Sequence, residues 1–331
     1  MKALRRVATV ALALALVAAS AFYWNPLWVN DQQIRYHLWQ ANVHSEYVDA
    51  GSYRLHYFEA VPSGGSAGIP LILVHGLASR GEDWAPMIPS LAAAGFHVYA
   101  PDLLGYGRSP RPANVVYSVA LEEGVLIDFM HAVGLQHADV DGWSMGGWVS
   151  AKLALDHPAM VDRLVLDDSA GVTFQPSFTR DAFSPTDTAG LKRLFVLLMP
   201  HPPTLDLYIV RATLHRIADN KKIVQSSMDS MASGADRLDP RLANITQPTL
   251  IVWGAEDRLI PLSVGKQMHQ LIPNSALQVV PNCGHLAPSQ CSGDVWAGTV
   301  MFLKANPPMR GGEFVMNSRV SAGPVIPAPT H

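Results

Sequence analysis

The segment from Asp139 to Ser150, DVDGWSMGGWVS, places a serine between glycines where an apolar run ends and a helix-like run begins. Its centre, Gly142-Trp143-Ser144-Met145-Gly146, matches the pattern G-x-S-x-G, which forms a sharp turn from a strand into a helix. Such a turn exposes the serine hydroxyl, and the flanking glycines remove side chains that would otherwise collide. Ser144 is therefore the candidate nucleophile, with Gly142 and Gly146 as supporting residues.

A serine hydroxyl is a weak nucleophile, so it needs a base and a group that orients the base. Two downstream segments supply these groups. GAEDRLIP contains Asp257 just after one apolar run, and NCGHLAP contains His285 after the next. The chain order serine, acid, histidine is the order found with G-x-S-x-G. Asp167 and Asp168, which end an earlier apolar run, are alternative acids.

Short apolar runs alternate with amphipathic segments, as is typical of an α/β protein with a mostly parallel sheet. We expect a hairpin over Glu46–Ala60 and six further strands, giving eight, that end at Gly76, Asp102, Gly142, Asp168, Gly254 and Pro281. We expect flanking helices over Trp84–Ala94, Ser118–Val133, Met145–Asp156 and Pro261–Ile272. The loops after parallel strands meet at one edge of the sheet, so the three candidate residues can converge there.

No strand is evident between Asp168 and Pro248, only proline-rich turns and helix-like pieces. We therefore predict a helical cap inserted after the sixth strand, over about residues 172–245. Most of its apolar side chains must pack the cap onto the core, and those left over are expected to line an acyl pocket. The apolar residues are Leu191, Leu194, Phe195, Val196, Leu197, Leu198, Met199, Leu205, Leu207, Tyr208 and Ile209.

The two ends of the chain differ from the middle. Three positive charges before Val7 precede an apolar run that reaches Ala19, which predicts either a signal peptide over residues 1–21 or an uncleaved membrane anchor. Either alternative places the protein outside the cytoplasm, periplasmic or secreted, with membrane association if the segment stays. Residues 306–331 are rich in Pro, Gly and Ser, which predicts a disordered tail. Residues 22–305 remain as the folded domain.

Composition limits the classes of function. The 331 residues are 49% hydrophobic and 15% charged, with a net charge of -3, which excludes a disordered chain and gives no basic patch for nucleic acid. Sequence motifs for metals and nucleotide cofactors are absent, so we expect no metal, no cofactor and a small-molecule substrate. The only cysteines are Cys283 and Cys291, and they form either a disulfide or two separate buried thiols.

The combination of His75-Gly76, DLLGYGRS, GWSMGG, the late aspartate and the late Gly-His resembles the α/β-hydrolase superfamily. Within it, the chain is similar to bacterial esterases and monoacylglycerol-lipase-like members. The resemblance implies that Ser144 is the nucleophile and that His285 is the general base. It also implies that Asp257, after the seventh strand, is the commoner position for the acid. The backbone N–H groups of Leu77 and Met145 would form the oxyanion hole, and His75 and Gly76 would support it.

The resemblance also bears on the reaction. A serine at the turn excludes relatives that use an aspartate nucleophile and leaves acyl transfer to water, so we expect a carboxylic ester hydrolase with a hydrophobic or lipid-like substrate. One alternative is a carbon–carbon bond hydrolase of the same fold, which usually has polar cap residues that bind a carboxylate. Another is a non-catalytic binding protein of this fold. Asp141, where relatives have an aliphatic residue, needs hydrogen-bond partners or a raised pKa if it is buried.

Overall fold

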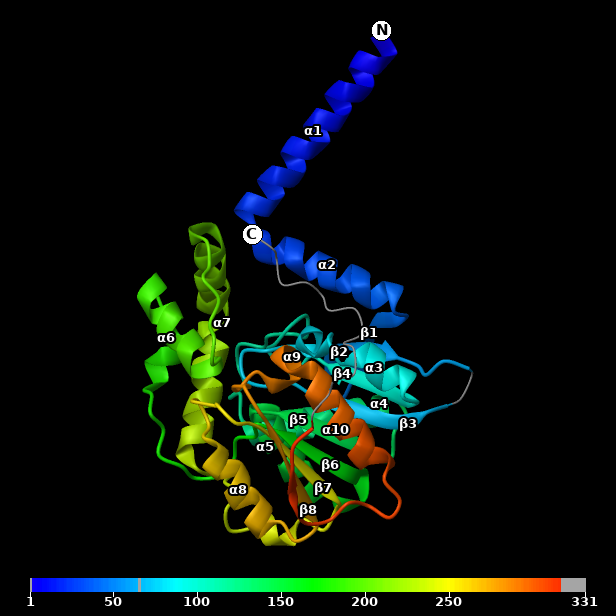
Figure 1. The fold of residues 1–331 in the computed structure, drawn as a ribbon, viewed down its shortest axis with the longest axis vertical. Helices are drawn as coiled ribbons and strands as arrows, with labels where there is room; N and C mark the ends of the chain where they lie inside the picture. Colours follow the sequence, from blue (N-terminus) through cyan, green and yellow to red (C-terminus); the bar gives the residue numbers. More distant parts are fainter. Residues whose placement is uncertain (1, 65–66, 317–331) are drawn as a thin grey trace.

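Uninterrupted apolar runs such as IPLILV and TLIVWG form the strands of a central sheet, because strands covered on both faces bury nearly every side chain. The structure is a computed structural model that describes residues 2–64 and 67–316 (Figure 1). Its strands are β1 (Val43–Ala50), β2 (Tyr53–Ala60), β3 (Ile69–Val74), β4 (Phe96–Pro101), β5 (Ala138–Trp143), β6 (Val161–Asp167), β7 (Thr249–Gly254), β8 (Ser275–Val280) and β9 (Glu313–Phe314).

The strand order is β1-β2-β4-β3-β5-β6-β7-β8-β9, and every pairing from β4 to β9 is parallel. Only the first two pairings, β1 with β2 and β2 with β4, are antiparallel. The sheet has nine strands rather than the expected eight, because β9 pairs with β8 at the edge. β9 comes from the segment predicted to be a disordered tail, and residues 317–331 of that segment lie outside the described residues.

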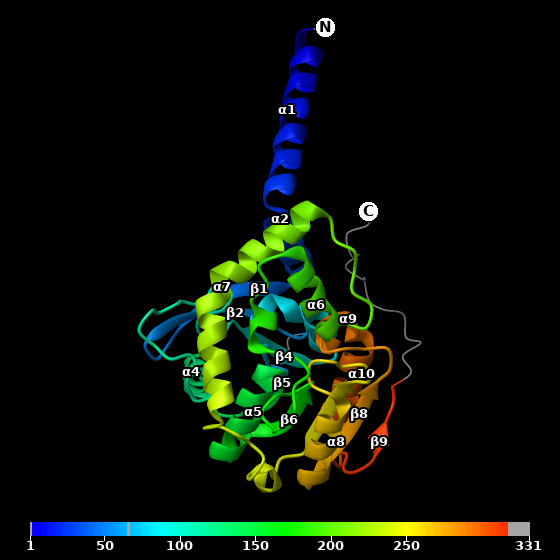
Figure 2. The ribbon, with the colours of Figure 1, turned by 90° about the vertical axis from the view of Figure 1, so that its left-hand side faces the viewer.

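Helices cover both faces of the sheet, as Figure 2 shows. One hydrophobic core lies under α4, α5 and α8, and a second lies under α3 and α10 on the opposite face. Their bounds are α3 (Ile88–Ala93), α4 (Val119–Ala132), α5 (Met145–Asp156), α8 (Leu262–Leu271), α9 (Ala287–Gln290) and α10 (Ser292–Lys304). Short 3-10 helices are η1 (Gly81–Trp84), η2 (Pro158–Met160), η3 (Arg180–Phe183) and η4 (Leu242–Asn244).

One predicted helix differs from the structure. The segment expected to be helical from Trp84 to Ala94 divides into η1 and α3, with turns between them. Pro86 lies in this gap, where a missing N–H and a fixed φ interrupt a helix, and Pro89 stands in the first turn of α3, where proline is tolerated.

The helical insertion predicted after β6 is present. It contains η3, α6 (Thr188–Leu198) and α7 (Leu207–Ser233), which ends at Gly234 in the left-handed conformation, φ 76°. Side-chain hydrogen bonds help to attach the cap to the body. Trp148 Nε1 donates to the carbonyl of Asp236 at 2.6 Å, and the hydroxyls of Tyr106 and Ser227 lie 2.8 Å apart. The cap is therefore anchored by buried polar contacts as well as by apolar packing.

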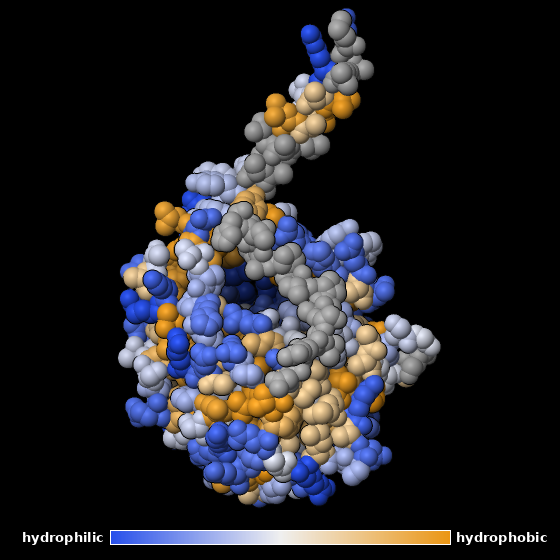
Figure 3. Space-filling view, in the orientation of Figure 1, coloured by the Kyte–Doolittle hydropathy of each residue, from blue (hydrophilic) through white to orange (hydrophobic). Residues whose placement is uncertain are grey.

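Two helices precede the sheet. α1 (Lys2–Trp24) projects from the body, and α2 (Pro26–Gln40) packs against β1 and α7 (Figures 1 and 2). Val7, Val10 and Leu12 are exposed on α1, and Figure 3 shows apolar side chains along it. Across the described ranges, no helix has both the length and the apolar character needed to cross a membrane. The membrane anchor and the signal peptide both stay predictions.

Candidate active site

Ser144 stands between β5 and α5 with φ 56° and ψ −117°, a conformation that is strained for any residue with a Cβ. The turn is as tight as the glycine pattern predicts. A Cβ on Gly146 would lie 2.1 Å from the carbonyl oxygen of Val74, and one on Gly142 would lie 2.5 Å from that of Gly146. The backbone N–H of Ser144 donates to the carbonyl of Asp167 at 2.9 Å. The central strands thus hold the serine at the end of β5.

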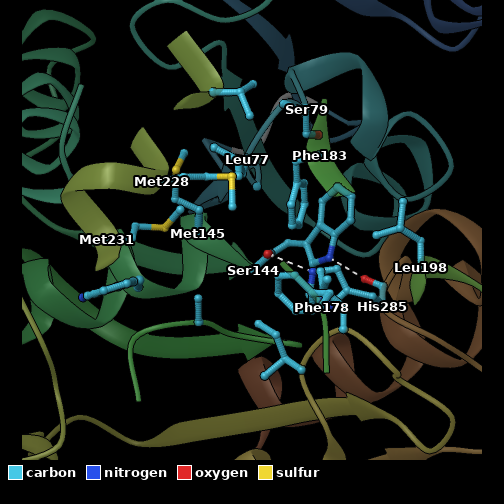
Figure 4. Close-up of a pocket in the computed structure, with 18 of the residues that line it drawn as sticks. Leu77, Ser79, Ser144, Met145, Phe178, Phe183, Leu198, Met228, Met231 and His285 are labelled. Carbon is cyan, nitrogen blue, oxygen red and sulfur yellow. Dashed lines mark hydrogen bonds between the residues drawn. The ribbon is translucent and has the colours of Figure 1, made fainter. Parts of the chain in front are cut away.

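The structure brings the three candidate side chains into contact. Ser144 Oγ donates to His285 Nε2 at 2.9 Å, a contact drawn as a dashed line in Figure 4. His285 Nδ1 donates to Asp257 Oδ2 at 2.8 Å. The other oxygen of Asp257 accepts the N–H groups of Leu259 and Ile260 at 2.8 and 2.9 Å. Asp257 therefore fixes both the tautomer and the orientation of the imidazole, an arrangement suited to a general base.

The pKa of His285 follows from its surroundings. His285 and Asp257 are only 3% and 7% exposed. Burial by itself lowers the pKa of the imidazole, but the charge and hydrogen bond of Asp257, with the charge of Asp168, outweigh burial and raise the pKa above its ordinary value. A raised pKa makes His285 a stronger base toward the serine proton.

The predicted oxyanion-hole residues flank the serine. Met145 is the first residue of α5, so its N–H has no acceptor within the helix, and Leu77 follows β3 on the other side of Ser144. A Cβ on Gly76 would lie 3.0 Å from the Cβ of Ser144, so a larger residue here would crowd the serine. His75 accepts the N–H of Leu103 at Nε2 and donates from Nδ1 to the carbonyl of Gly76, which supports the loop. The oxyanion role itself stays a prediction.

A cavity of about 620 Å³ opens onto Ser144, within the range of roughly 300–1,000 Å³ that is usual for ligand sites. In Figure 4, Met228 and Met231 of α7 lie on one side of Ser144, and Leu198 lies on the side of His285. Phe178 and Phe183 pack edge to face near the serine, with ring centroids 5.6 Å apart. Of the apolar cap residues predicted from the sequence, only Leu194 and Leu198 line the cavity, and Leu207 is 78% exposed.

Comparisons with known proteins agree with this geometry. A family model described as the alpha/beta hydrolase fold matches residues 69–199 and 202–290. The chain belongs to the α/β-hydrolase family. This hydrolase is 33% identical over 228 residues to the 2-hydroxymuconate semialdehyde hydrolase of Pseudomonas putida, an alignment that covers 66% of this chain and 81% of that protein.

Solved structures show the same fold. A membrane phospholipase A, described as a bacterial virulence factor, superposes on the hydrolase with a TM-score of 0.76 and 24% identity, covering 90% of this chain and 98% of that one. A serine hydrolase involved in carbazole degradation superposes with a TM-score of 0.66 and 27% identity, covering 79% and 98%. At 24% identity, the likeness to the phospholipase shows the fold alone.

His285 is held in place by contacts that the local sequence patterns do not predict. Trp143 Nε1 donates to the carbonyl of His285 at 2.8 Å, and the N–H of His285 donates to the carbonyl of Leu198 in the cap at 2.9 Å. Cys283 and Cys291 form a disulfide, so the first of the two alternatives for the cysteines is the observed one. The histidine loop is therefore fixed by the turn at Ser144, by the cap and by a covalent bridge.

The charged side chains around the cavity of the hydrolase are mostly paired. Arg216 contacts Asp31 of α2 at 2.9 Å, and Arg180 contacts Asp229 at 2.7 Å. Arg237, which also lines the cavity, forms no ion pair within residues 2–64 and 67–316. A carboxylate bound in the cavity would thus find Arg237 as its available cation.

Asp141 lies directly behind the serine turn and is fully buried together with Asp167 on the neighbouring strand. No other group in the described part of the chain hydrogen-bonds their carboxyl oxygens, and the two carboxyls interact with each other. Burial raises the pKa of Asp141 to about 7, and burial together with the charges of Asp141 and Asp168 raises that of Asp167. Asp141 and Asp167 therefore form a buried carboxyl pair in which the pKa of both groups is raised.

Proposed function

We propose that this protein is a serine hydrolase that cleaves hydrophobic carboxylic esters through an acyl-enzyme intermediate. The observation that carries the proposal is the apolar cavity that opens onto a serine hydrogen-bonded to a histidine. Aromatic and aliphatic side chains of α7, α6 and the loop before η3 line it, which suits an acyl chain. That no metal or cofactor takes part stays a prediction.

The geometry supports an ordered sequence of steps. Ser144 Oγ attacks the ester carbonyl while His285 Nε2 takes its proton, and Asp257 stabilises the imidazolium that forms. The N–H groups of Met145 and Leu77 would bind the oxygen that becomes negative. His285 then gives its proton to the leaving alcohol. Water, activated by the same histidine, releases the acid and restores the serine.

Carbon–carbon bond hydrolysis is the second candidate, and the names of the curated relatives support it better than they support ester cleavage. The relative from Pseudomonas putida is a 2-hydroxymuconate semialdehyde hydrolase. Its reaction would need a cation for the substrate carboxylate, and Arg237 is the residue that could supply it. The apolar lining and the ion pairs of Arg180 and Arg216 favour the ester reaction instead.

One experiment separates the two reactions. The full chain is assayed with p-nitrophenyl esters from acetate to palmitate and with 2-hydroxymuconate semialdehyde, beside the variants Ser144→Ala and Arg237→Gln. We expect ester turnover with a preference for medium or long acyl chains, lost in Ser144→Ala and little changed in Arg237→Gln. If the protein turned over only 2-hydroxymuconate semialdehyde, and if Arg237→Gln raised the KM for it, the second candidate would replace the ester proposal.

The disulfide supports the predicted periplasmic or secreted location, because disulfides persist in oxidising compartments. Fractionation of cells that produce the full chain tests this. The protein should appear outside the cytoplasm with Cys283 and Cys291 protected from thiol-specific alkylation, and a cytoplasmic protein with alkylated cysteines would refute the location.

A further inference from the structure

Asp31 is a buried carboxylate on α2, and its partners come from two other segments of the chain. It is 5% exposed. Its Oδ1 accepts an N–H of Arg80 at 2.6 Å, and its Oδ2 accepts an N–H of Arg216 at 2.9 Å. Arg80 follows β3 in the loop that also carries Leu77, and Arg216 belongs to the cap helix α7. One carboxylate therefore joins α2, the body of the fold and the cap.

Further contacts hold α2 in this place. It packs beside α7, as Figure 2 shows, and its Arg35 forms an ion pair with Glu82 of η1. Burying a carboxylate is costly unless the group is paired, and two guanidinium groups meet that need at Asp31. The family model begins at residue 69, so Asp31 lies outside the matched segments. The mechanism above does not use Asp31 in any step.

Arg216 lines the cavity of the proposed active site. Ser79 and Asp83, which lie on either side of Arg80 in the sequence, line it as well, and Asp83 accepts the backbone N–H of Arg80 at 3.2 Å. Asp31 itself is not part of the lining, so it can act on a ligand only through the arginines that it contacts. The pairing of Asp31 therefore determines how much positive charge this polar part of the cavity presents.

The ion pair uses the end of the Arg216 side chain that a ligand carboxylate would need. Nη2 donates to Oδ2 of Asp31 at 2.9 Å and Nη1 donates to Oδ1 at 3.4 Å, so both terminal nitrogens face the carboxylate. A planar guanidinium binds a carboxylate best in this bidentate manner. Within residues 2–64 and 67–316, Asp31 is the only carboxylate that pairs with Arg216, whereas Arg80 also contacts Glu82 at 3.1 Å. Loss of the charge on Asp31 would leave Arg216, but not Arg80, without an anionic partner.

We propose that Asp31 is a positioning residue that determines which ligands the cavity accepts. Because it holds the guanidinium of Arg216, it withholds a positive charge from the ligand. The site then favours uncharged esters and does not retain the carboxylate that hydrolysis releases. This inference rests on the ester hydrolysis proposed above, and it names the residue that restricts the substrates to uncharged ones.

Binding of decanoate and of decanol to full-length Ser144→Ala, measured by calorimetry, tests this role, because the two ligands differ only at the charged end. Adding Asp31→Asn should lower the Kd of decanoate about fivefold or more, as expected for one new charge-assisted hydrogen bond at a partly exposed site, and leave the Kd of decanol unchanged. A further change, Arg216→Gln, should abolish this gain. Asp31→Glu keeps the charge and should not produce it. A decanoate Kd that does not fall, or an equal gain for decanol, would overturn the proposal.

Asp219→Asn is the matched control. It removes the same charge from α7, but Asp219 contacts the exposed His215, so its loss releases no cation of the cavity and the Kd of decanoate should stay at the parent value. Arg216→Gln alone gives a second test that leaves Asp31 paired with Arg80. It should hardly change the Kd of decanoate, because Arg216 is already engaged. A large loss of affinity would show that Arg216 already serves the ligand and would refute the proposal. Thermal unfolding verifies that each variant is folded, and Arg216→Gln decides the matter if Asp31→Asn is not.

The binding measurements need no turnover, which separates this inference from the proposed function. In the active protein, decanoate should inhibit hydrolysis of p-nitrophenyl butyrate with a lower Ki in Asp31→Asn than in the parent. A protein that hydrolyses no ester, yet shows the shift in the Kd of decanoate, would refute the ester proposal and support the control of ligand charge by Asp31. A protein that hydrolyses esters without that shift would refute the role of Asp31 alone.

Discussion

Replacement of Ser144 by glycine is expected to stabilise the fold relative to replacement by alanine, although both variants lose the nucleophile. Ser144 holds φ 56° and ψ −117°, which glycine adopts without strain. Strain of this kind costs about 1–3 kcal/mol. Against this, glycine has more conformational freedom in the unfolded chain, which lowers the free energy of unfolding by about 0.5–1 kcal/mol. The balance is a gain of about 1 kcal/mol in the free energy of unfolding, which raises Tm by about 2 °C in a domain of more than 250 residues.

Thermal unfolding of Ser144→Gly and Ser144→Ala measures this difference. Both variants lose the hydrogen bond to His285 Nε2, so its contribution cancels in the comparison. Ser150, inside α5, provides the control pair, because there glycine should be less stable than alanine by about 1 kcal/mol. A Tm of Ser144→Gly equal to or below that of Ser144→Ala would refute the reasoning that the serine is held under strain.

Two further predictions concern the support of the site. The double variant Cys283→Ser/Cys291→Ser opens a bridge with a sequence separation of 8 residues, and we expect a loss of about 2–3 kcal/mol of stability. We also expect a lower kcat, because the loop that carries His285 is no longer held by the disulfide. An unchanged Tm and kcat would contradict this. The variant Asp141→Asn tests how the stability of the fold depends on pH. The native state keeps the proton of Asp141 up to about pH 7, whereas the unfolded chain loses it near its ordinary pKa, so the carboxyl destabilises the fold increasingly as pH rises through that interval. The Tm of Asp141→Asn relative to the parent should therefore be higher at pH 8 than at pH 5, and a difference that does not grow with pH would rule this out.

Local signals in the sequence were enough to predict much of the site. The G-x-S-x-G pattern requires a strand, a tight turn and a helix, and β5, Ser144 and α5 have that order. Asp257 and His285 follow two mainly apolar runs that form the parallel strands β7 and β8, and this predicts that both residues lie at the same edge of the sheet. The structure brings Ser144, Asp257 and His285 within hydrogen-bonding distance of one another in series.

Other features depend on contacts between distant segments, which no local pattern encodes. The bond from Trp143 to the carbonyl of His285 joins residues 142 positions apart. α7 and the loop before η3 both contribute to the cavity lining. Which face of a cap helix turns toward the cavity depends on how that helix packs on the body, and this packing is not encoded locally. β9 consists of only two residues, too few to show a period, and it forms because the edge of β8 is available for pairing.

The same three side chains serve both reactions considered for this hydrolase, so the choice between them is made elsewhere. Ser144 is fixed by β5 and β6 and His285 by Trp143 and the disulfide, all in the rigid body of the fold. The cap is expected to supply the surface that contacts the remainder of the substrate, and it reaches the histidine through the backbone bond that the N–H of His285 donates to the carbonyl of Leu198. Substitutions in α7 should therefore change which substrate is preferred, through KM and chain-length selectivity, whereas substitutions around His285 should lower kcat for every substrate alike.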